Sequence, residues 1–211
     1  MKSLTKYLAS GALALALSAG AATAATLSFV GVGATQLVTD YDLVPDLDGT
    51  TIEFITGNLK TAANGVSVTG PALVTFTFLG SSAGNTNFSA RMIGGMFNNT
   101  TALNTSLTFA QLVTGLIDFR FLTTAPPPAV GMISNNGIAV PNSADFAIGY
   151  SAIFNGGKSI YVLFDDIAGG DRDFDDFSMQ ITVAAIPLPA AGFLLIGALG
   201  GLAFLRRRKT V

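Results

Sequence analysis

Cysteine, histidine and tryptophan are all absent from the 211 residues of this chain. Without cysteine, neither disulfides nor thiolate metal sites can form. Without histidine, the chain lacks the commonest general base, the nucleophiles that an imidazole activates, and imidazole-ligated zinc. The chemistry that remains rests mostly on carboxylates, hydroxyls and amides.

Charged residues are also scarce, at 11% of the chain, whereas 50% of it is hydrophobic. A disordered protein has the opposite balance, so we expect the chain to bury a core. All thirteen acidic residues lie between Asp40 and Asp176, where five basic residues accompany them, so this body carries a net charge of −8. Affinity for nucleic-acid phosphates comes from lysine and arginine, and nucleic acid is therefore not an expected partner.

The N-terminal end, residues 1–24, has the three parts of a secretory signal peptide. A positive segment with two lysines precedes an apolar segment at residues 7–19, and Ala22 and Ala24 form an A-x-A cleavage site. We expect export through the Sec translocon and cleavage by signal peptidase before Ala25, with a second register one residue later. The apolar segment is shorter than the roughly 20 residues of a membrane span, which favours cleavage over a permanent anchor.

The C-terminal end is an uncharged apolar run followed at once by a basic cluster. Residues 190–205 would span roughly 24 Å as a helix, slightly less than the hydrocarbon core of a bilayer. The basic cluster is Arg206, Arg207, Arg208 and Lys209. Positive charges beside a span hold that end in the cytoplasm, so the body should face outward from the inner membrane, in agreement with the signal peptide.

A short proline motif precedes the apolar run and consists of Ile186, Pro187, Leu188, Pro189 and Ala190. This motif, the apolar helix and the basic end, in that order, resemble the PEP-CTERM class of sorting signals, and more closely its V-P-L-P-A variant. The match has isoleucine where the variant has valine, and it lacks the glutamate of the P-E-P motif. The resemblance covers residues 185–211. It implies an exosortase-type membrane protease that removes the helix and releases or re-anchors the body; the alternative is a permanent anchor.

Between these ends, residues 25–184 are dominated by alternation of apolar and polar side chains, which is typical of half-buried strands. Two segments are representative. In one, Val74, Phe76 and Phe78 should share a face, and in the other, residues 177–183 alternate without exception. Alternation also predicts that Ile117, Phe119 and Phe121 face inward while Asp118 and Arg120 face outward. Further strands are expected at residues 27–32, 51–55, 106–109, 146–154 and 159–164.

Turn signals such as Asn136-Gly137 and Asn155-Gly156-Gly157 separate these strands, and helical periodicity is scarce. Only residues 109–115 are expected to form a short helical turn. The sequence therefore predicts an all-β fold, an antiparallel β-sandwich of jelly-roll-like type with about eight to ten strands. An open barrel is the alternative. The flanking segments would add an N-terminal signal helix and a C-terminal transmembrane helix.

The densest group of candidate ligands is a run of carboxylates between two apolar strands. Like charges at such density repel one another unless they are solvated or neutralised by a cation. Calcium takes six to eight oxygen ligands and tolerates irregular loops, and Gly169-Gly170 would let the carboxylates converge. The candidate calcium ligands are Asp165, Asp166, Asp171, Asp173, Asp175 and Asp176.

The spacing of these carboxylates excludes an EF-hand, because Asp176 and Thr182 stand where its glycine and glutamate would be. The D-R-D-F-D-D stretch at residues 171–176 resembles a motif that recurs near the end of secreted β-sandwich domains, including many that carry such sorting tails. The resemblance implies a structural or calcium-linked acidic hairpin. The alternative is a solvated turn in which Arg172 pairs with a neighbouring aspartate.

Other carboxylates are more dispersed along the chain. A second acidic group surrounds Pro45 and is expected to form a polar loop; it consists of Asp40, Asp42, Asp46 and Asp48. Glu53, the only glutamate, is expected to face outward from a strand.

These features favour a non-catalytic exported protein at the cell surface or in an exopolysaccharide matrix. One alternative is a secreted polysaccharide hydrolase or lyase, which needs two carboxyl groups about 5 to 10 Å apart in a cleft. Another is a carbohydrate-binding module with exposed aromatic rings on one sheet face. The tyrosines available to such a module in the body are Tyr41, Tyr150 and Tyr161.

Overall fold

The computed structural model describes residues 24–31, 33–39, 41–57, 64–83, 86–92, 94–124, 131–140, 146–166 and 172–186, together with Gly197 and Gly200. Residues Ala25–Ala185 form one compact unit, and the two ends, Met1–Ala24 and Ile186–Val211, fall outside it. The expected signal helix and the expected C-terminal span therefore lie almost wholly outside the described residues. Within the described ranges, no helix combines the length and the apolar character that crossing a membrane requires.

The described part of the compact unit is all-β and contains fifteen strands in three sheets, paired antiparallel throughout. The seven-stranded sheet has the order β2 (Ala34–Leu37), β3 (Thr51–Thr56), β13 (Ala147–Tyr150), β14 (Ser159–Asp165), β15 (Phe177–Ala185), β5 (Ala72–Gly80) and β8 (Ser106–Gln111). The five-stranded sheet has the order β12 (Ala139–Val140), β11 (Gly131–Ser134), β10 (Arg120–Thr123), β6 (Asn87–Ala90) and β7 (Gly95–Asn98). The three-stranded sheet has the order β1 (Thr26–Val30), β4 (Gly65–Thr69) and β9 (Gly115–Leu116).

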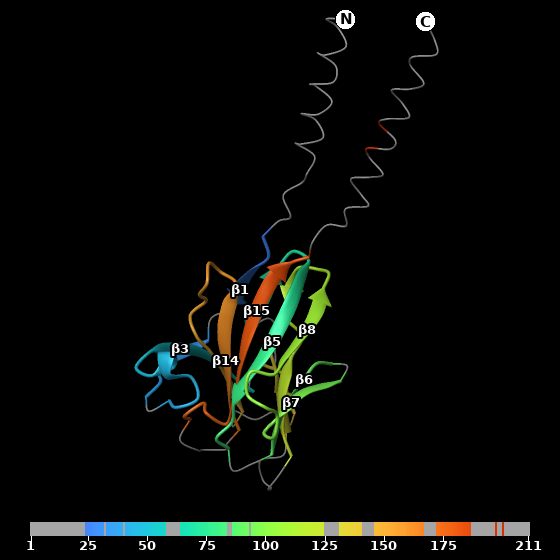
Figure 1. Ribbon diagram of the computed structural model, residues 1–211. Coiled ribbons are helices and arrows are strands. Elements are labelled where there is room, and N and C mark those ends of the chain that lie inside the picture. Colours follow the sequence, from blue (N-terminus) through green and yellow to red (C-terminus); the bar gives the residue numbers. More distant parts are fainter. Residues whose placement is uncertain are drawn as a thin grey trace, which may run out of the picture. The chain divides into compact units, whose positions relative to one another are not determined.

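The predicted alternation is confirmed most clearly in β5 and β15, which lie side by side in Figure 1. Phe78 pairs with Met179, Phe76 with Ile181 and Val74 with Val183, and all six side chains are buried. Because partners in register point to the same face, these two strands present one continuous apolar surface. The side chains between them on β5 point to the other face and are half-buried.

The core lies between the seven-stranded sheet and the other two sheets, so the fold is sandwich-like. Phe121 of β10 stacks on Phe164 of β14, with ring centroids 4.9 Å apart, and it meets Phe177 of β15 edge-on at 5.7 Å. Phe97 of β7 likewise contacts Phe78 of β5 at 5.9 Å. Such aromatic contacts across two facing sheets supply much of the apolar burial that stabilises a sandwich.

Three local expectations can be compared with the structure. Ile117, Phe119 and Phe121 are buried as predicted, while Asp118 is exposed and Arg120 is half-buried. The Asn136-Gly137 turn is confirmed between β11 and β12, where Gly137 has a φ of 78°. The helical turn expected at residues 109–115 is wrong, because pairing with β5 extends β8 through Gln111.

A buried amide connects all three sheets. The Asn135 side chain, just after β11, donates from Nδ2 to the carbonyl oxygens of Val66 and Ile117, each at 2.8 Å. Its Oδ1 accepts the Val66 N–H at 3.0 Å and the Tyr150 hydroxyl of β13 at 2.8 Å. Every hydrogen-bonding position of the amide is thus used. Gly65 permits this close approach, since a Cβ there would lie 1.8 Å from the Asn135 carbonyl oxygen.

We predict that Asn135→Ala lowers the free energy of unfolding by about 3 kcal/mol or more, because it leaves several buried polar groups without partners. Urea denaturation monitored by circular dichroism measures the change. Asn136→Ala is the matched control, since its Oδ1 accepts a single hydrogen bond, from the Ile138 N–H. The control should cost at most about 1 kcal/mol. Equal stabilities of the two variants would contradict the role of Asn135.

Candidate functional site

A second, smaller core covers the outer face of the seven-stranded sheet at β3, β13 and β14. Its buried members are Val38, Tyr41, Val44, Leu47, Ile52, Ala147, Leu163 and Phe174. On β14, Leu163 belongs to this small core, whereas its neighbours Val162 and Phe164 belong to the large one. Because successive side chains of a strand point to opposite faces, the sheet is buried on both sides here.

The part of the acidic segment at residues 172–176 is attached to this outer face through its two non-acidic residues, Arg172 and Phe174. Phe174 is fully buried, with its ring centroid 5.6 Å from that of Phe54. The Arg172 guanidinium lies over the Phe54 ring, 5.3 Å from its centroid. The backbone carbonyl oxygen of Arg172 accepts a hydrogen bond from Gln36 Nε2 at 2.5 Å. Arg172 and Phe174 have φ values of 53° and 63°, so the segment winds through left-handed conformations to place both.

Three of the six predicted calcium ligands are buried together beside this anchor. Asp165 ends β14, Asp166 follows it, and Asp176 immediately precedes β15; their exposed fractions are 3%, 0% and 7%. The Asp166 N–H donates to Asp176 Oδ2 at 2.6 Å. The structure thus brings together carboxylates that lie ten residues apart in the sequence.

The other three predicted ligands have different surroundings. Asp173 is exposed and Asp175 is half-buried, and Asp171 lies outside the described residues together with the glycine pair at 169–170. Asp173 Oδ1 accepts the Asp175 N–H at 3.3 Å. Within the described ranges, no three carboxylates are arranged so that they could hold a metal ion.

The buried carboxylates have a marked electrostatic consequence. Burial raises the pKa of Asp176 from 3.8 to about 8; the hydrogen bond from the Asp166 N–H lowers it, and the neighbouring carboxylates of Asp166, Asp165 and Asp173 raise it. A carboxyl group in this position is therefore protonated at neutral pH unless a cation stabilises its ionised form.

The second acidic group is connected to the first by a tyrosine. The Tyr41 hydroxyl donates to the Phe174 carbonyl oxygen at 3.1 Å and is also paired with Ser178 Oγ. Burial, and after it the carboxylates of Asp175, Asp173 and Asp176, raise the pKa of Tyr41, so its hydroxyl stays protonated. The sequence interpretation missed this connection, although the alternation of apolar residues with carboxylates in residues 41–48 could have indicated it.

The carboxylates of that second group behave largely as predicted. Asp42, Asp46 and Asp48 are exposed, and Asp40 lies outside the described residues. A short 3-10 helix, Pro45–Leu47, buries Leu47 against the sheet. Glu53 is half-buried in β3 rather than fully exposed.

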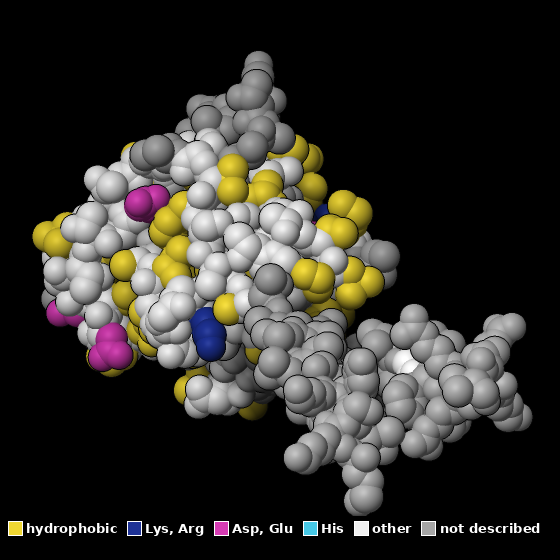
Figure 2. Space-filling model, turned by 90° about the horizontal axis from the view of Figure 1, so that it is seen from above, with side chains coloured by type: hydrophobic (Ala, Val, Ile, Leu, Met, Phe, Trp, Pro, Cys, Tyr) yellow, Lys and Arg dark blue, Asp and Glu magenta, His cyan; other side chains and the backbone are white. Residues whose placement is uncertain are grey.

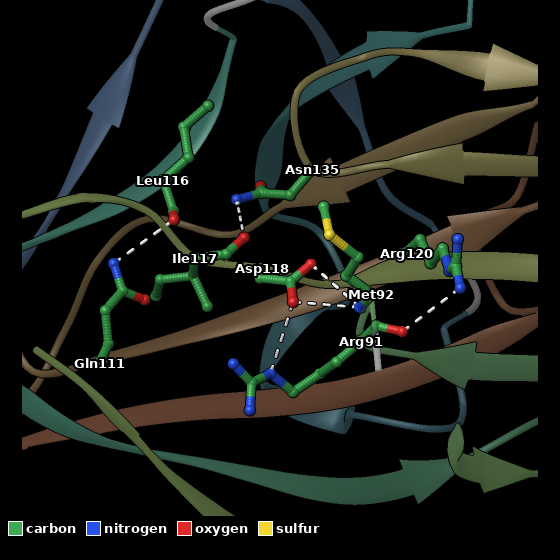
Figure 3. A network of polar contacts seen from close by, with 8 residues as sticks. All are labelled: Arg91, Met92, Gln111, Leu116, Ile117, Asp118, Arg120 and Asn135. Carbon is green, nitrogen blue, oxygen red and sulfur yellow. Dashed lines mark hydrogen bonds and ion pairs between the residues drawn. The ribbon is translucent and has the colours of Figure 1, made fainter. Parts of the chain in front are cut away.

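A separate polar network surrounds Asp118 and is drawn in Figure 3. Both Asp118 oxygens accept the Met92 N–H, at 3.0 and 3.3 Å, and Oδ2 lies 3.7 Å from Arg91 Nε. Arg120 donates to the Arg91 carbonyl oxygen at 3.4 Å. An exposed ion pair of this kind stabilises a fold by about 1 kcal/mol or less. Asp118 therefore serves mainly to fix the turn after β6.

The predicted processing residues are described only in part. Ala24 is exposed, Ala25 is buried and Ile186 is half-buried, whereas Ala22, residues 187–190 and residues 206–209 lie outside the described residues. No family model, no curated protein and no solved structure matches this chain.

We predict that, in the presence of a chelator, the stability of the protein falls as pH rises from about 5 to about 8. The sign follows from the pKa of Asp176, which is higher in the folded protein than in the unfolded chain. As pH rises, the Asp176 carboxyl group therefore loses its proton first in the unfolded chain. The free energy of unfolding falls over this range by up to about 1.4 kcal/mol per pH unit. Urea denaturation across the range measures the slope.

Asp176→Asn, which is neutral at every pH, should remove most of this slope. Asp48→Asn is the control, because Asp48 is exposed and should leave the slope unchanged. A flat profile for the unmodified protein, or the same slope in both variants, would show that the Asp176 carboxyl group is not the source.

Proposed function

We propose that this chain is a non-catalytic exported protein that reaches the cell surface or an exopolysaccharide matrix through a C-terminal sorting signal. In this proposal the Sec translocon exports it, signal peptidase cuts before Ala25, and the inner membrane holds the precursor by a helix at residues 190–205. An exosortase-type protease then acts at the motif formed by residues 186–190. The body would be a jelly-roll-like sandwich.

The observation that carries the proposal is the order of segments along the chain. A positive, apolar and A-x-A sequence stands at one end, and a proline motif, an apolar run and four basic residues stand at the other. The compact unit Ala25–Ala185 begins where the signal would be cut and ends beside Ile186. This agreement between the limits of the unit and the two processing points supports the proposal.

The buried carboxylates support a further part of the proposal, that calcium stabilises the acidic segment. Carboxylate oxygens are the ligands that calcium prefers, and it accepts irregular coordination. Asp165, Asp166 and Asp176 supply such oxygens, and a positive ion would offset the repulsion between these neighbouring buried carboxylates. Asp171, Asp173 and Asp175 are the remaining candidate ligands.

A polysaccharide hydrolase or lyase is less well supported. Its chemistry needs two carboxyl groups facing each other across an open cleft. The carboxylates that come together in this fold, Asp165, Asp166 and Asp176, are instead buried at the junction of β14 and β15. Asp118 is engaged with the Met92 N–H and Arg91.

The intact mass of the protein recovered from the cell envelope and medium of its native host tests the sorting proposal. We expect a species that begins at Ala25 and lacks the segment after the proline motif. Pro187→Ala combined with Pro189→Ala should leave the C-terminal segment in place. The control Pro71→Ala, in the body, should still lose that segment. A mature species that retains Arg206, in the unmodified protein, would mean that the tail is a plain anchor.

The calcium proposal predicts that millimolar calcium raises the melting temperature by several degrees at about pH 8, through preferential binding to the folded state. The rise should be smaller at about pH 5, where Asp176 keeps its proton and competes with the ion. Asp165→Asn combined with Asp176→Asn should abolish the calcium-dependent rise in melting temperature, and Asp48→Asn should leave it unchanged. No shift at either pH, measured by differential scanning calorimetry, would exclude a calcium role.

A further inference from the structure

A pocket on the outer face of the seven-stranded sheet combines two aromatic rings with a polar rim. It has a volume of about 280 Å³ and lies where the turn before β3 meets the segment after β13. Its lining residues are Asp46, Leu47, Thr50, Thr51, Ser151, Ala152, Phe154 and Tyr161. Tyr41 and Tyr150 are buried elsewhere, so Tyr161 is the one tyrosine of the described body that is available to a ligand.

The two rings pack against each other and together form an aromatic platform in the wall of the pocket. The Phe154 and Tyr161 centroids are 4.8 Å apart and the ring planes are tilted by 34°, and both side chains are half-buried. The backbone holds them in place: Phe154 pairs with Ser159 across the Asn155-Gly156 turn, and the Tyr161 N–H donates to Ser151 Oγ at 3.0 Å. The platform therefore exists before any ligand binds, which lowers the cost of binding.

The rim offers both a donor and an acceptor. Thr50 and Ser151 use their hydroxyls within the wall, donating to the carbonyl oxygens of Leu47 and Ala152. Burial and then the nearby Asp46 carboxylate raise the pKa of Tyr161, so its hydroxyl remains a donor while Asp46 remains an exposed acceptor. A ligand that fits must present an apolar face to the rings and hydroxyls at its edge.

Charge and shape narrow the class of ligand. Asp42, Asp46 and Asp48 are all exposed on the turn that borders the pocket, in a body of net charge −8, so an anionic ligand would be repelled. Figure 2 shows a face of the molecule on which hydrophobic and uncharged side chains outnumber charged ones. A quaternary ammonium ion needs aromatic rings on several sides, whereas these two rings contact each other and offer one surface.

We propose that this pocket binds a neutral sugar ring, whose C–H face stacks on Phe154 and Tyr161 while its hydroxyls bond to Asp46 and the Tyr161 hydroxyl. A sugar ring has this combination of an apolar face and an edge of hydroxyls that both donate and accept. Sugar binding by this pocket follows from its rings and its polar rim alone. Its assignment to matrix polysaccharide rests on the proposed function, which supplies the reason for a polymer to be present.

Calorimetric titration of the full-length chain, held in a detergent without a sugar headgroup, tests the proposal. The neutral probes are cellotetraose, maltotetraose and chitotetraose, and the counter-probes are tetragalacturonate and choline. We expect at least one neutral probe to bind with a dissociation constant in the millimolar range or below, and tetragalacturonate and choline to bind at least about tenfold more weakly. No saturable binding of any neutral probe up to about 10 mM would overturn the proposal, as would stronger binding of either counter-probe.

Variants assign the binding to this pocket. Tyr161→Ala and Asp46→Asn should each weaken the neutral probe at least about tenfold. Tyr161→Phe should have a smaller effect, because it keeps the ring. Phe109→Ala is the control for loss of a half-buried aromatic side chain of the same sheet, since Phe109 lies on β8 beneath Arg91, and it should leave affinity unchanged. Equal affinity in Tyr161→Ala and the unmodified chain would overturn the assignment.

The outcome is independent of processing at the two ends. If the intact-mass experiment fails while a neutral sugar still binds and Tyr161→Ala abolishes the binding, the pocket stands and only its link to an extracellular polymer is lost. If processing occurs as proposed and no neutral sugar binds, the sorting proposal stands and the pocket assignment is wrong.

Discussion

Burial of the seven-stranded sheet on both faces at β3, β13 and β14 is the constraint on which the candidate sites depend. Along β14, alternate side chains enter the large phenylalanine core and the small core around Tyr41 and Phe174. A strand that is covered on both faces offers no solvated face to the polar side chains at its end. Asp165 and Asp166 at its C-terminal end, together with Asp176 just before β15, are therefore drawn into the interior, and this burial raises the pKa of Asp176.

The same constraint explains how two acidic loops distant in sequence come to share one surface. The residues that cover the outer face alternate with acidic ones: Tyr41, Val44 and Leu47 in one loop, and Phe174 in the other. Gly149 leaves room for this arrangement, since a Cβ there would lie 3.0 Å from the Phe174 ring. The apolar residues determine where each loop lies, and the carboxylates are carried along with them.

The sequence was sufficient for the class of the fold, because burial alternates along the whole of β5 and the residue types of β15 alternate from Phe177 to Val183. It did not predict the short strands β2, β6 and β7, whose four residues hold too few apolar positions to define a period. The density of aspartates identified the acidic segment. It did not show which of these aspartates are buried, because that depends on contacts with Tyr41, more than a hundred residues away. Nothing local to Asn135 indicates that it connects three sheets, since its partners Val66, Ile117 and Tyr150 lie in three segments distant from it along the chain.

The raised pKa of Asp176 gives the chain a group that titrates near neutral pH, which its composition otherwise lacks. With no histidine, no unperturbed side chain of this protein exchanges a proton near neutral pH. A buried carboxyl group with a pKa of about 8 fills that gap, but only once the sheet has formed. At neutral pH the folded body therefore carries one negative charge fewer than the unfolded chain, and each molecule that folds takes up a proton from the solution. The acidity of the compartment in which the chain folds thus acts directly on its folding equilibrium.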